Sequence, residues 1–431
     1  MVDQAALVIV GNGIAGTTLA RQVRKSSGRP ITIVSEEHPY FFSRTALMYV
    51  YMGHMPFEQL EPYERSFWEG NAITCLQDRV IGFDAEQKQL FLSQGEPLAY
   101  SDLVWAVGSQ PNRMGWPGER ARRVQGLYHK QDLDQLEAWS PEIDQAVIVG
   151  GGLIGIELAE MLHSRGKKVT FLVREDSFWN TVLPSEDSAL LNQHILNHGI
   201  DLRLGTELER IETDADGNAI GVITTAGEAI SCQYVGLTVG VRPNIDFLKE
   251  TALKTDRGLL VNRYLETNLP QVYALGDCAQ QQEPLPGRGA VEAVWYTGRM
   301  MGETLAQTLC GQPTAYQPGP WFNSAKFFDI EYQTYGQVSA QPNPSHEMQW
   351  HWQHPSENRL LRFAYDPTTQ HLLGVNSFGM RLRHEVLHHW LQEGIAIEAA
   401  VAQFAMAQFD PEFTRNDLPE IQRVFQPQNS H

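Results

Sequence analysis

The chain has 431 residues, of which 42% are hydrophobic and 19% are charged, so a disordered protein or a coiled coil is excluded. Its 33 basic and 51 acidic residues give a formal net charge of -18, which argues against nucleic acid or an anionic membrane as the main partner. The length predicts two or three domains. The four cysteines form no C-x-x-C pair, and the sequence shows neither a signal segment nor an 18-residue apolar run. We therefore expect a cytoplasmic protein without an integral membrane segment.

The first glycine-rich segment, ALVIVGNGIAGTTLA (Ala6–Ala20), has the pattern of a buried strand, a tight turn and a helix. Its Gly11, Gly13 and Gly16 fit G-x-G-x-x-G, a pattern that brings a helix N-terminus up to a pyrophosphate. Glu36 follows the next apolar run and is predicted to accept hydrogen bonds from ribose hydroxyls, with the adjacent Glu37 as the alternative.

The second glycine-rich segment, AVIVGGGLIGIELAE (Ala146–Glu160), repeats this pattern with Gly150, Gly152 and Gly155. Arg174 follows its second strand, where it would suit the 2′-phosphate of NADPH, or would simply be a solvated side chain. The preference between NADPH and NADH therefore stays open. Two such segments predict two dinucleotide-binding domains in one chain.

The segments between and after these two loops are rich in short strands. A Pro/Gly-rich boundary lies at 313–320, and before it we expect one helix, over Val291–Leu309. We expect strands at Leu90–Leu92, Leu103–Val107, Leu202–Ile223 (with a turn at Asp214–Asn218), Tyr234–Val239 and Val272–Asp277. Beyond it, we expect antiparallel strands at Glu347–Trp352, Leu360–Tyr365 and Leu372–Ser377 and helices at Arg383–Gln392 and Ile397–Phe409. This order predicts an α+β C-terminal domain.

Five motifs together carry a family resemblance. They are GNGIAG, WAVGSQPN (Trp105–Asn112), GGGLIGIELAE (Gly150–Glu160), GVRPN (Gly240–Asn244) and VYALGDCAQ (Val272–Gln280). In this order the chain resembles the two-dinucleotide flavoproteins of the pyridine nucleotide–disulfide oxidoreductase superfamily. The resemblance implies an α/β fold with two Rossmann-like domains. The FAD domain would comprise 1–117 and 245–316, the NAD(P)H domain 118–244, and the C-terminal α+β domain 317–431.

The resemblance also assigns roles to single residues. The first loop would bind FAD and the second NAD(P)H. Gly108 would close the first half of the FAD domain, Gly276 would be a cofactor-binding residue, and Asp277 would hydrogen-bond the ribityl chain of the flavin. Glu157 matches a catalytic glutamate at the nicotinamide pocket, and Gly240 matches a glycine whose backbone approaches the nicotinamide.

One expected residue is absent. Thiol-dependent relatives place a redox cysteine in a segment that corresponds to Tyr40–Thr45, and this chain has Arg44 at that position. Arginine forms no thiolate, so dithiol chemistry is excluded there. Arg44 is predicted to bind FAD phosphates, with an ion pair to Glu36 or Glu37 as the alternative. Cys278 is expected to be a buried apolar group without redox work.

Two further segments favour the rubredoxin/ferredoxin reductase-like branch: Phe42–Tyr49, and Pro320–Ser324 with its Trp321. Trp321 would cover the flavin or serve ordinary domain packing. A positively charged cluster of three histidines and two arginines lies in and just before the helix predicted over Arg383–Gln392. Its members are Arg381, Arg383, His384, His388 and His389. We interpret the cluster as a polar face where an acidic carrier could dock rather than as a metal site. No metal is predicted.

We therefore expect an FAD-dependent oxidoreductase that passes electrons from NAD(P)H via FAD to a separate acceptor. The expected acceptor is a rubredoxin- or ferredoxin-like carrier. The chain has no cysteine set for an iron–sulfur cluster of its own. The alternatives are an NAD(P)H-sensing interaction protein similar to apoptosis-inducing factor, or an NADH oxidase or quinone reductase. The acceptor, the pathway and the choice between monomer and homodimer stay open.

Overall fold

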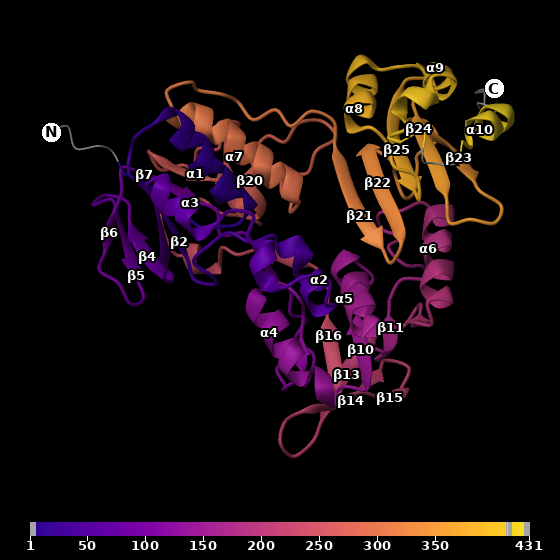
Figure 1. The fold of residues 1–431 in the computed structure, drawn as a ribbon, viewed down its shortest axis with the longest axis horizontal. Helices are drawn as coiled ribbons and strands as arrows, with labels where there is room; N and C mark the ends of the chain where they lie inside the picture. Colours follow the sequence, from indigo (N-terminus) through magenta and orange to yellow (C-terminus); the bar gives the residue numbers. More distant parts are fainter. Residues whose placement is uncertain (1–5, 411, 413–415, 426–431) are drawn as a thin grey trace. The chain divides into compact units, whose positions relative to one another are not determined.

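The computed structural model describes residues 6–410, 412 and 416–425 (Figure 1). Their contacts divide the chain into two units. Unit 1 comprises Met1–Met114, Gly126–Glu142 and Gly240–Pro318, and unit 2 comprises Gly115–Gln125, Ile143–Val239 and Gly319–His431. The outermost residues of the first and last predicted domains, 1–5 and 426–431, lie outside the described residues.

Unit 1 is built on a five-stranded parallel sheet with the order β19-β7-β1-β2-β3. Its strands are β1 (Leu7–Val10), β2 (Ile31–Ser35), β3 (Ile73–Gln77), β7 (Asp102–Trp105) and β19 (Val272–Ala274). All four residues of β1 are buried, which explains its unbroken apolar run, because a parallel strand is covered on both faces.

Two helices of unit 1, α1 (Ile14–Ser26) and α7 (Trp295–Leu309), lie side by side (Figure 1). Gly302 permits this approach, because a Cβ there would lie 2.7 Å from the backbone oxygen of Ala15. The other elements are shorter: η1 (Arg44–Ala46), α2 (Leu47–Tyr51), η2 (Phe57–Leu60), α3 (Arg65–Gly70), β4 (Val80–Asp84), β5 (Gln89–Leu92), β6 (Leu98–Ala99), β8 (Ser109–Pro111), α4 (Lys130–Trp139), η3 (Ser140–Glu142), β17 (Val241–Pro243), η4 (Asp246–Leu248), β18 (Leu259–Val261), η5 (Gly276–Cys278) and β20 (Ala279–Gln281).

Unit 2 contains a second five-stranded parallel sheet, with the order β12-β11-β10-β16-β9. Its strands are β9 (Val124–Gln125), β10 (Gln145–Val149), β11 (Lys168–Leu172), β12 (Asp201–Arg203) and β16 (Tyr234–Leu237). Two helices, α5 (Leu153–Ser164) and α6 (Ser185–Asn197), accompany this sheet, with a small antiparallel sheet of β13 (Leu208–Thr213), β14 (Ala219–Thr224) and β15 (Ala229–Ser231).

The C-terminal part of unit 2 forms an antiparallel sheet with the order β21-β22-β25-β24-β23. Its strands are β21 (Phe322–Phe327), β22 (Ile330–Gly336), β23 (Met348–Gln353), β24 (Leu360–Tyr365) and β25 (Leu372–Phe378), and its helices are α8 (His384–Glu393), α9 (Ile397–Ala402), η6 (Phe404–Ala407) and α10 (Leu418–Val424). Phe363, Trp390 and Phe404 share one core, so these helices cover the sheet.

Two predicted helices have different bounds in the structure. The helix expected over Val291–Leu309 begins at Trp295, because Val294 is extended with φ -135° and ψ 140°. The helix expected over Ile397–Phe409 is wrong as one element. It ends at Ala402, because Gln403 leaves the helical region, and a 3-10 turn then buries Phe404 completely in the core.

Candidate dinucleotide-binding sites

The first glycine loop connects β1 to α1 in unit 1. Gly11 has φ +111°, and a Cβ there would lie 2.1 Å from the backbone oxygen of Ala106. A Cβ at Gly16 would lie 2.1 Å from the backbone oxygen of Gly11. Gly13 differs, because no atom lies within 4 Å of the position of its missing Cβ. It is the N-cap of α1, whose first turn has no side-chain cap and no acidic residue. The loop therefore presents a helix N-terminus to open space, which fits a pyrophosphate group.

The second loop repeats this geometry between β10 and α5 in unit 2. Gly150 has φ +117°, and a Cβ there would lie 2.5 Å from the backbone oxygen of Thr238. A Cβ at Gly155 would lie 2.4 Å from the oxygen of Gly150, whereas Gly152 again faces open space and begins an uncapped helix. Thr238 donates its hydroxyl proton to the backbone oxygen of Val149 at 2.9 Å, which holds the loop to the next strand. Each unit thus has one loop that fits a dinucleotide phosphate.

The two carboxylates after β2 lie in different environments. The Glu36 side chain is 57% exposed and has one loose ion pair, 3.5 Å from Arg79. The Glu37 side chain is 10% exposed and accepts hydrogen bonds from Arg44 at 3.0 and 2.5 Å and from the backbone N–H of Lys130 at 2.7 Å. Burial would raise the pKa of Glu37, but hydrogen bonds from His129 and Arg44 outweigh it and lower the pKa to about 2. Glu37 is therefore fully engaged, while the carboxylate of Glu36 is accessible.

Arg44 is part of this buried pair. Besides Glu37, its guanidinium contacts the backbone oxygen of Tyr128 and lies 4.8 Å from the centre of that ring. The ion pair predicted as the alternative role of Arg44 is present, with Glu37 as the partner. A direct contact between Arg44 and FAD phosphates stays a prediction.

Asp277 lies in η5, directly after β19. Its carboxylate accepts a hydrogen bond from the Ser109 hydroxyl at 2.9 Å, and the Ser109 N–H donates to the Tyr128 hydroxyl oxygen at 3.1 Å. Burial raises the pKa of Asp277, although Ser109 and Arg44 oppose this. The sequence patterns did not indicate Ser109 or Tyr128 as site residues, although Ser109 stands next to Gly108 in the WAVGSQPN motif.

Three further glycines adopt left-handed backbone conformations near this cluster in unit 1. They are Gly108 (φ +66°), Gly240 (φ +85°) and Gly276 (φ +72°). The Asn112 N–H donates to the oxygen of Gly240 at 3.0 Å, and the Asn244 N–H donates to that of Gly108 at 2.9 Å. The structure thus accounts for these glycines by backbone conformation, and their contacts with a flavin or nicotinamide stay predictions.

Glu157 lies on α5, one helical turn before Glu160. Burial raises the pKa of Glu157 to about 7, and the charge of Glu160 adds to this effect. Glu160 forms an ion pair with Lys326 at 2.8 Å. Glu157 is therefore the carboxyl that can hold or release a proton near neutral pH beside the second loop, which suits a catalytic position. Its role toward nicotinamide stays a prediction.

Two other predicted residues also lie in unit 2. Arg174 is 67% exposed and pairs with Glu175 at 2.7 Å, so it is free to exchange that neighbour for a phosphate. Trp321 is half-buried just before β21, where its backbone oxygen accepts a hydrogen bond from the Gly336 N–H at 2.7 Å. Neither the phosphate role of Arg174 nor a flavin contact of Trp321 is tested by these positions.

The cysteines have no disulfide partners among the described residues. Cys278 is completely buried beside Asp277, and burial raises the pKa of its thiol to about 12. Burial raises the pKa of Cys75 to about 11 and that of Cys232 to about 12. A reactive thiolate is disfavoured at all three positions, as expected for Cys278.

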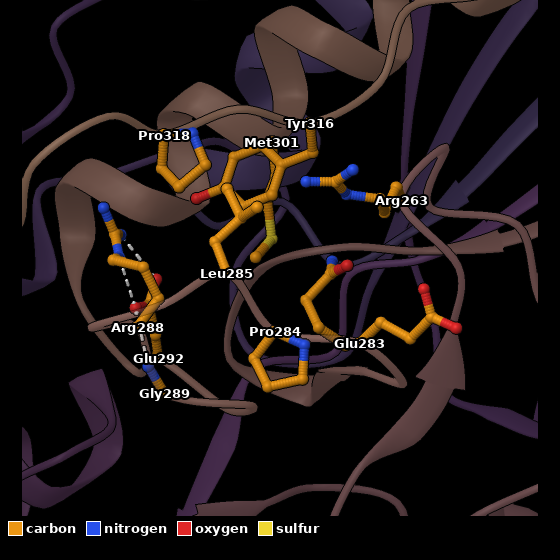
Figure 2. Close-up of a pocket in the computed structure, with 11 residues that line it drawn as sticks. Arg263, Glu283, Pro284, Leu285, Arg288, Gly289, Glu292, Met301, Tyr316 and Pro318 are labelled. Carbon is orange, nitrogen blue, oxygen red and sulfur yellow. Dashed lines mark hydrogen bonds and ion pairs between the residues drawn. The ribbon is translucent and has the colours of Figure 1, made fainter.

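A separate pocket of unit 1 is lined by Arg263, Glu283, Arg288, Glu292 and Tyr316, among others (Figure 2). Arg288 and Glu292 form a buried ion pair at 2.6 Å on its wall. None of the residues predicted to bind a cofactor lines this pocket. It is therefore distinct from the first glycine loop.

The predicted docking cluster begins before α8 in the C-terminal part of unit 2. Arg381 pairs with Glu331 at 2.8 Å, which neutralises part of the expected positive charge. The rings of His384 and His388 lie 5.5 Å apart, and burial lowers the pKa of both. The cluster keeps Arg383, but its role in docking stays a prediction.

Two parallel sheets, each with a strand–glycine loop–helix phosphate cradle, define an oxidoreductase fold that binds two dinucleotides. The family model described as pyridine nucleotide-disulphide oxidoreductase matches residues 5–301, and the chain belongs to this family. The predicted family and fold class are thereby confirmed.

Several proteins with known names are similar to the chain. The 5,5'-dehydrodivanillate O-demethylase ferredoxin reductase subunit of Sphingobium sp. is 32% identical, with 77% of this chain and 82% of the relative covered. A ferredoxin–NAD(P)(+) reductase of Sphingomonas sp. is 31% identical over 77% and 80%. The putidaredoxin reductase of a covalent complex with putidaredoxin matches in fold with a TM-score of 0.82 at 21% identity, over 97% of this chain and 98% of that one.

Proposed function

We propose that this chain is an FAD-dependent enzyme that accepts hydride from NAD(P)H and passes the electrons to a separate, small electron-carrier protein. The observation that carries this proposal is the pair of open glycine loops at Gly13 and Gly152, together with high thiol pKa values and an arginine where thiol-dependent relatives have cysteine. The FAD part would comprise 1–117 and 245–316, the NAD(P)H part 118–244, and the third domain 317–431. We place the enzyme in the cytoplasm.

The flavin, when bound, supplies the redox chemistry, because it accepts a hydride and can release electrons one at a time. The chain's own residues bind and orient. The N-terminus of α1 would hold the FAD pyrophosphate, and Glu36 would accept hydrogen bonds from a ribose. Asp277, held in place by Ser109, would face the ribityl chain.

The NAD(P)H residues have a different task. The N-terminus of α5 would hold the nucleotide phosphates. Glu157, whose pKa is about 7, would hold a proton at its carboxyl oxygen or release it near neutral pH. Because an uncharged carboxyl group both donates and accepts hydrogen bonds, its protonation would alter how the nicotinamide amide is held.

The names of the relatives favour a protein acceptor. Two of the relatives are ferredoxin reductases by name, and the fold also matches that of putidaredoxin reductase in its covalent complex with putidaredoxin. We therefore propose an iron–sulfur or rubredoxin-like carrier as the acceptor of this chain. Arg383 and the neighbouring histidines on α8 would provide a docking surface for an acidic carrier.

A stopped-flow panel tests the proposal. FAD-loaded protein is mixed with NADH or NADPH, and the loss of flavin absorption is followed before a ferredoxin, a rubredoxin, a quinone or O₂ is added. We expect fast flavin reduction and fast reoxidation by at least one carrier protein, with slow reoxidation by O₂. Reoxidation mainly by O₂ or quinone would contradict the carrier proposal. A long-lived reduced complex that none of the acceptors oxidises would instead identify a nucleotide sensor.

A further inference from the structure

Two histidines and one aspartate converge within unit 2, and none of them belongs to a glycine loop. His194 lies on α6 and His198 is its C-cap residue, so the two side chains share one face of the helix. Asp329 lies in the turn between β21 and β22, and Figure 1 shows this hairpin near α6. Oδ1 of Asp329 is 2.8 Å from Nε2 of His194 and 3.6 Å from Nε2 of His198. One potential ligand atom from each residue lies within 4.8 Å of the other two.

The hydrogen bonds of His198 fix which of its nitrogens faces Asp329. Its Nδ1 lies 2.9 Å from the backbone oxygen of His194, and a carbonyl oxygen only accepts hydrogen bonds. Nδ1 must therefore carry the hydrogen. In the neutral ring, Nε2 then presents its lone pair to the negatively charged carboxylate of Asp329. A positive charge between these two acceptors, either a proton or a metal ion, would turn this contact into a favourable one.

His194 also turns a ring nitrogen toward Asp329. Its side chain is 2% exposed, and its Nε2 lies 2.8 Å from Oδ1 of Asp329. At its far side, Nδ1 lies 3.0 Å from the side-chain nitrogen Nδ2 of Asn358. A half-turn of this amide brings its oxygen to Nδ1, which then donates a hydrogen bond and leaves the lone pair of Nε2 for a metal ion.

The turn that carries Asp329 is held against these rings. Phe328 has φ +54°, an uncommon conformation for a bulky residue, and its ring stacks on His198 with 4.1 Å between centroids and 16° between planes. Phe328 is itself buried. This stacking fixes the hairpin tip beside α6, so Asp329 is presented to both histidines although its own side chain is 77% exposed.

From this arrangement we propose that His194, His198 and Asp329 bind a divalent transition-metal ion of the Zn²⁺, Co²⁺ or Ni²⁺ class and thereby fasten the β21–β22 hairpin to α6. Two imidazoles and one carboxylate favour such ions over Ca²⁺ or Mg²⁺, which prefer oxygen ligands. Ligand atoms around a tetrahedral Zn²⁺ are about 3.3 Å apart, given metal–ligand bonds of about 2.0–2.1 Å. The distances of 2.8 and 3.6 Å lie on either side of this value. The exposed side of Asp329 leaves a fourth position for water.

The proposal is tested by metal titration of the FAD-loaded protein. Zn²⁺ is added in competition with a chromophoric chelator, and the stoichiometry is measured by dialysis and metal analysis. The wild type is compared with Asp329→Asn and His198→Gln, which alter the two more exposed ligands. His388→Gln is the matched control, because His384 and His388 also form an i, i+4 pair on a helix but do not form part of such a cluster with a described carboxylate.

We expect one Zn²⁺ per chain in the wild type and in His388→Gln, and at least tenfold weaker binding in Asp329→Asn and His198→Gln. Zn²⁺ should also raise the melting temperature of the wild type but not that of Asp329→Asn. Equal affinity in all four proteins would identify adventitious binding and overturn the proposal. Loss of binding only in His388→Gln would overturn it as well. So would the absence of Zn²⁺ binding, which would leave a proton as the positive charge between these groups.

Discussion

Replacing Glu37 by Gln tests the electrostatics next to the first glycine loop. The carboxyl has an ordinary pKa of 4.5 and a pKa of about 2 in the folded protein. Because each pKa unit corresponds to about 1.4 kcal/mol, ionised Glu37 contributes about 3 kcal/mol to folding stability at neutral pH. This agrees with the loss of about 3–5 kcal/mol seen when one member of a buried ion pair is removed. Glu37→Gln should therefore lower the free energy of unfolding by about 3 kcal/mol at pH 7.

The pH dependence of this loss has a definite direction. Because the folded pKa lies below the unfolded one, the contribution of Glu37 is complete above about pH 4.5 and disappears as the pH falls toward 2. The free energies of unfolding of the wild type and Glu37→Gln, measured with urea at each pH, should thus differ by about 3 kcal/mol at pH 7 and converge in acid. FAD is held at the same multiple of each protein's own Kd, so that ligand binding stabilises both proteins equally.

The neighbouring Glu36 provides the matched control. Its side chain is 57% exposed with one loose ion pair, so Glu36→Gln should change the free energy of unfolding by less than about 0.5 kcal/mol. If Glu36 accepts a hydrogen bond from the ribose, the same substitution should weaken FAD binding about tenfold, since hydrogen bonds to charged groups contribute about 1.5–3 kcal/mol. Equal destabilisation by both substitutions would refute the reasoning. So would a difference in the free energy of unfolding between the wild type and Glu37→Gln that stays the same in acid.

Other substitutions test the remaining assignments. Gly13→Val should leave a folded but colourless protein, because no atom lies within 4 Å of a Cβ there and the new side chain enters the phosphate space. A yellow Gly13→Val protein would contradict the FAD assignment. Gly16→Val, in contrast, should be destabilised by a collision with the backbone. Arg174→Glu should shift the NADPH/NADH ratio of kcat/KM toward NADH if Arg174 binds a 2′-phosphate, and an unchanged ratio removes that role. Replacing Arg381 and Arg383 by Gln should slow association with an acidic carrier, most strongly at low salt; stopped-flow rates equal to those of the wild type would place docking elsewhere.

The glycine loops could be predicted from the sequence because their geometry depends on a short stretch of chain. Gly11 and Gly150 both have φ above +100°, and a Cβ at Gly16 or Gly155 would lie within 2.5 Å of a backbone oxygen of the same loop. Such contacts leave a sequence pattern of fixed spacing. The apolar runs of parallel strands are equally local, which is why strands of both sheets, such as those over Leu103–Val107 and Tyr234–Val239, could be predicted.

The β21–β22 hairpin could not be predicted in this way. Phe322–Phe327 reads FNSAKF, and most of its residues are half-buried rather than alternately buried and exposed. Its strand conformation depends on pairing with β22, which in turn pairs with β25. The ion pair between Lys326 and Glu160 could not be predicted for the same reason, because Lys326 lies on β21, far from Glu160 in the sequence.

The two glycine loops share their backbone geometry but differ in the charges around them, and these charges depend on tertiary partners. Next to the first loop, Arg44 and His129 keep Glu37 ionised down to about pH 2. Beside the second, burial and the charge of Glu160 hold the pKa of Glu157 at about 7. Between pH 6 and 8 the charge of Glu37 is therefore constant, while that of Glu157 changes. A pattern of glycines can thus identify a phosphate cradle, but the proton chemistry beside it follows from residues that only the folded chain brings together.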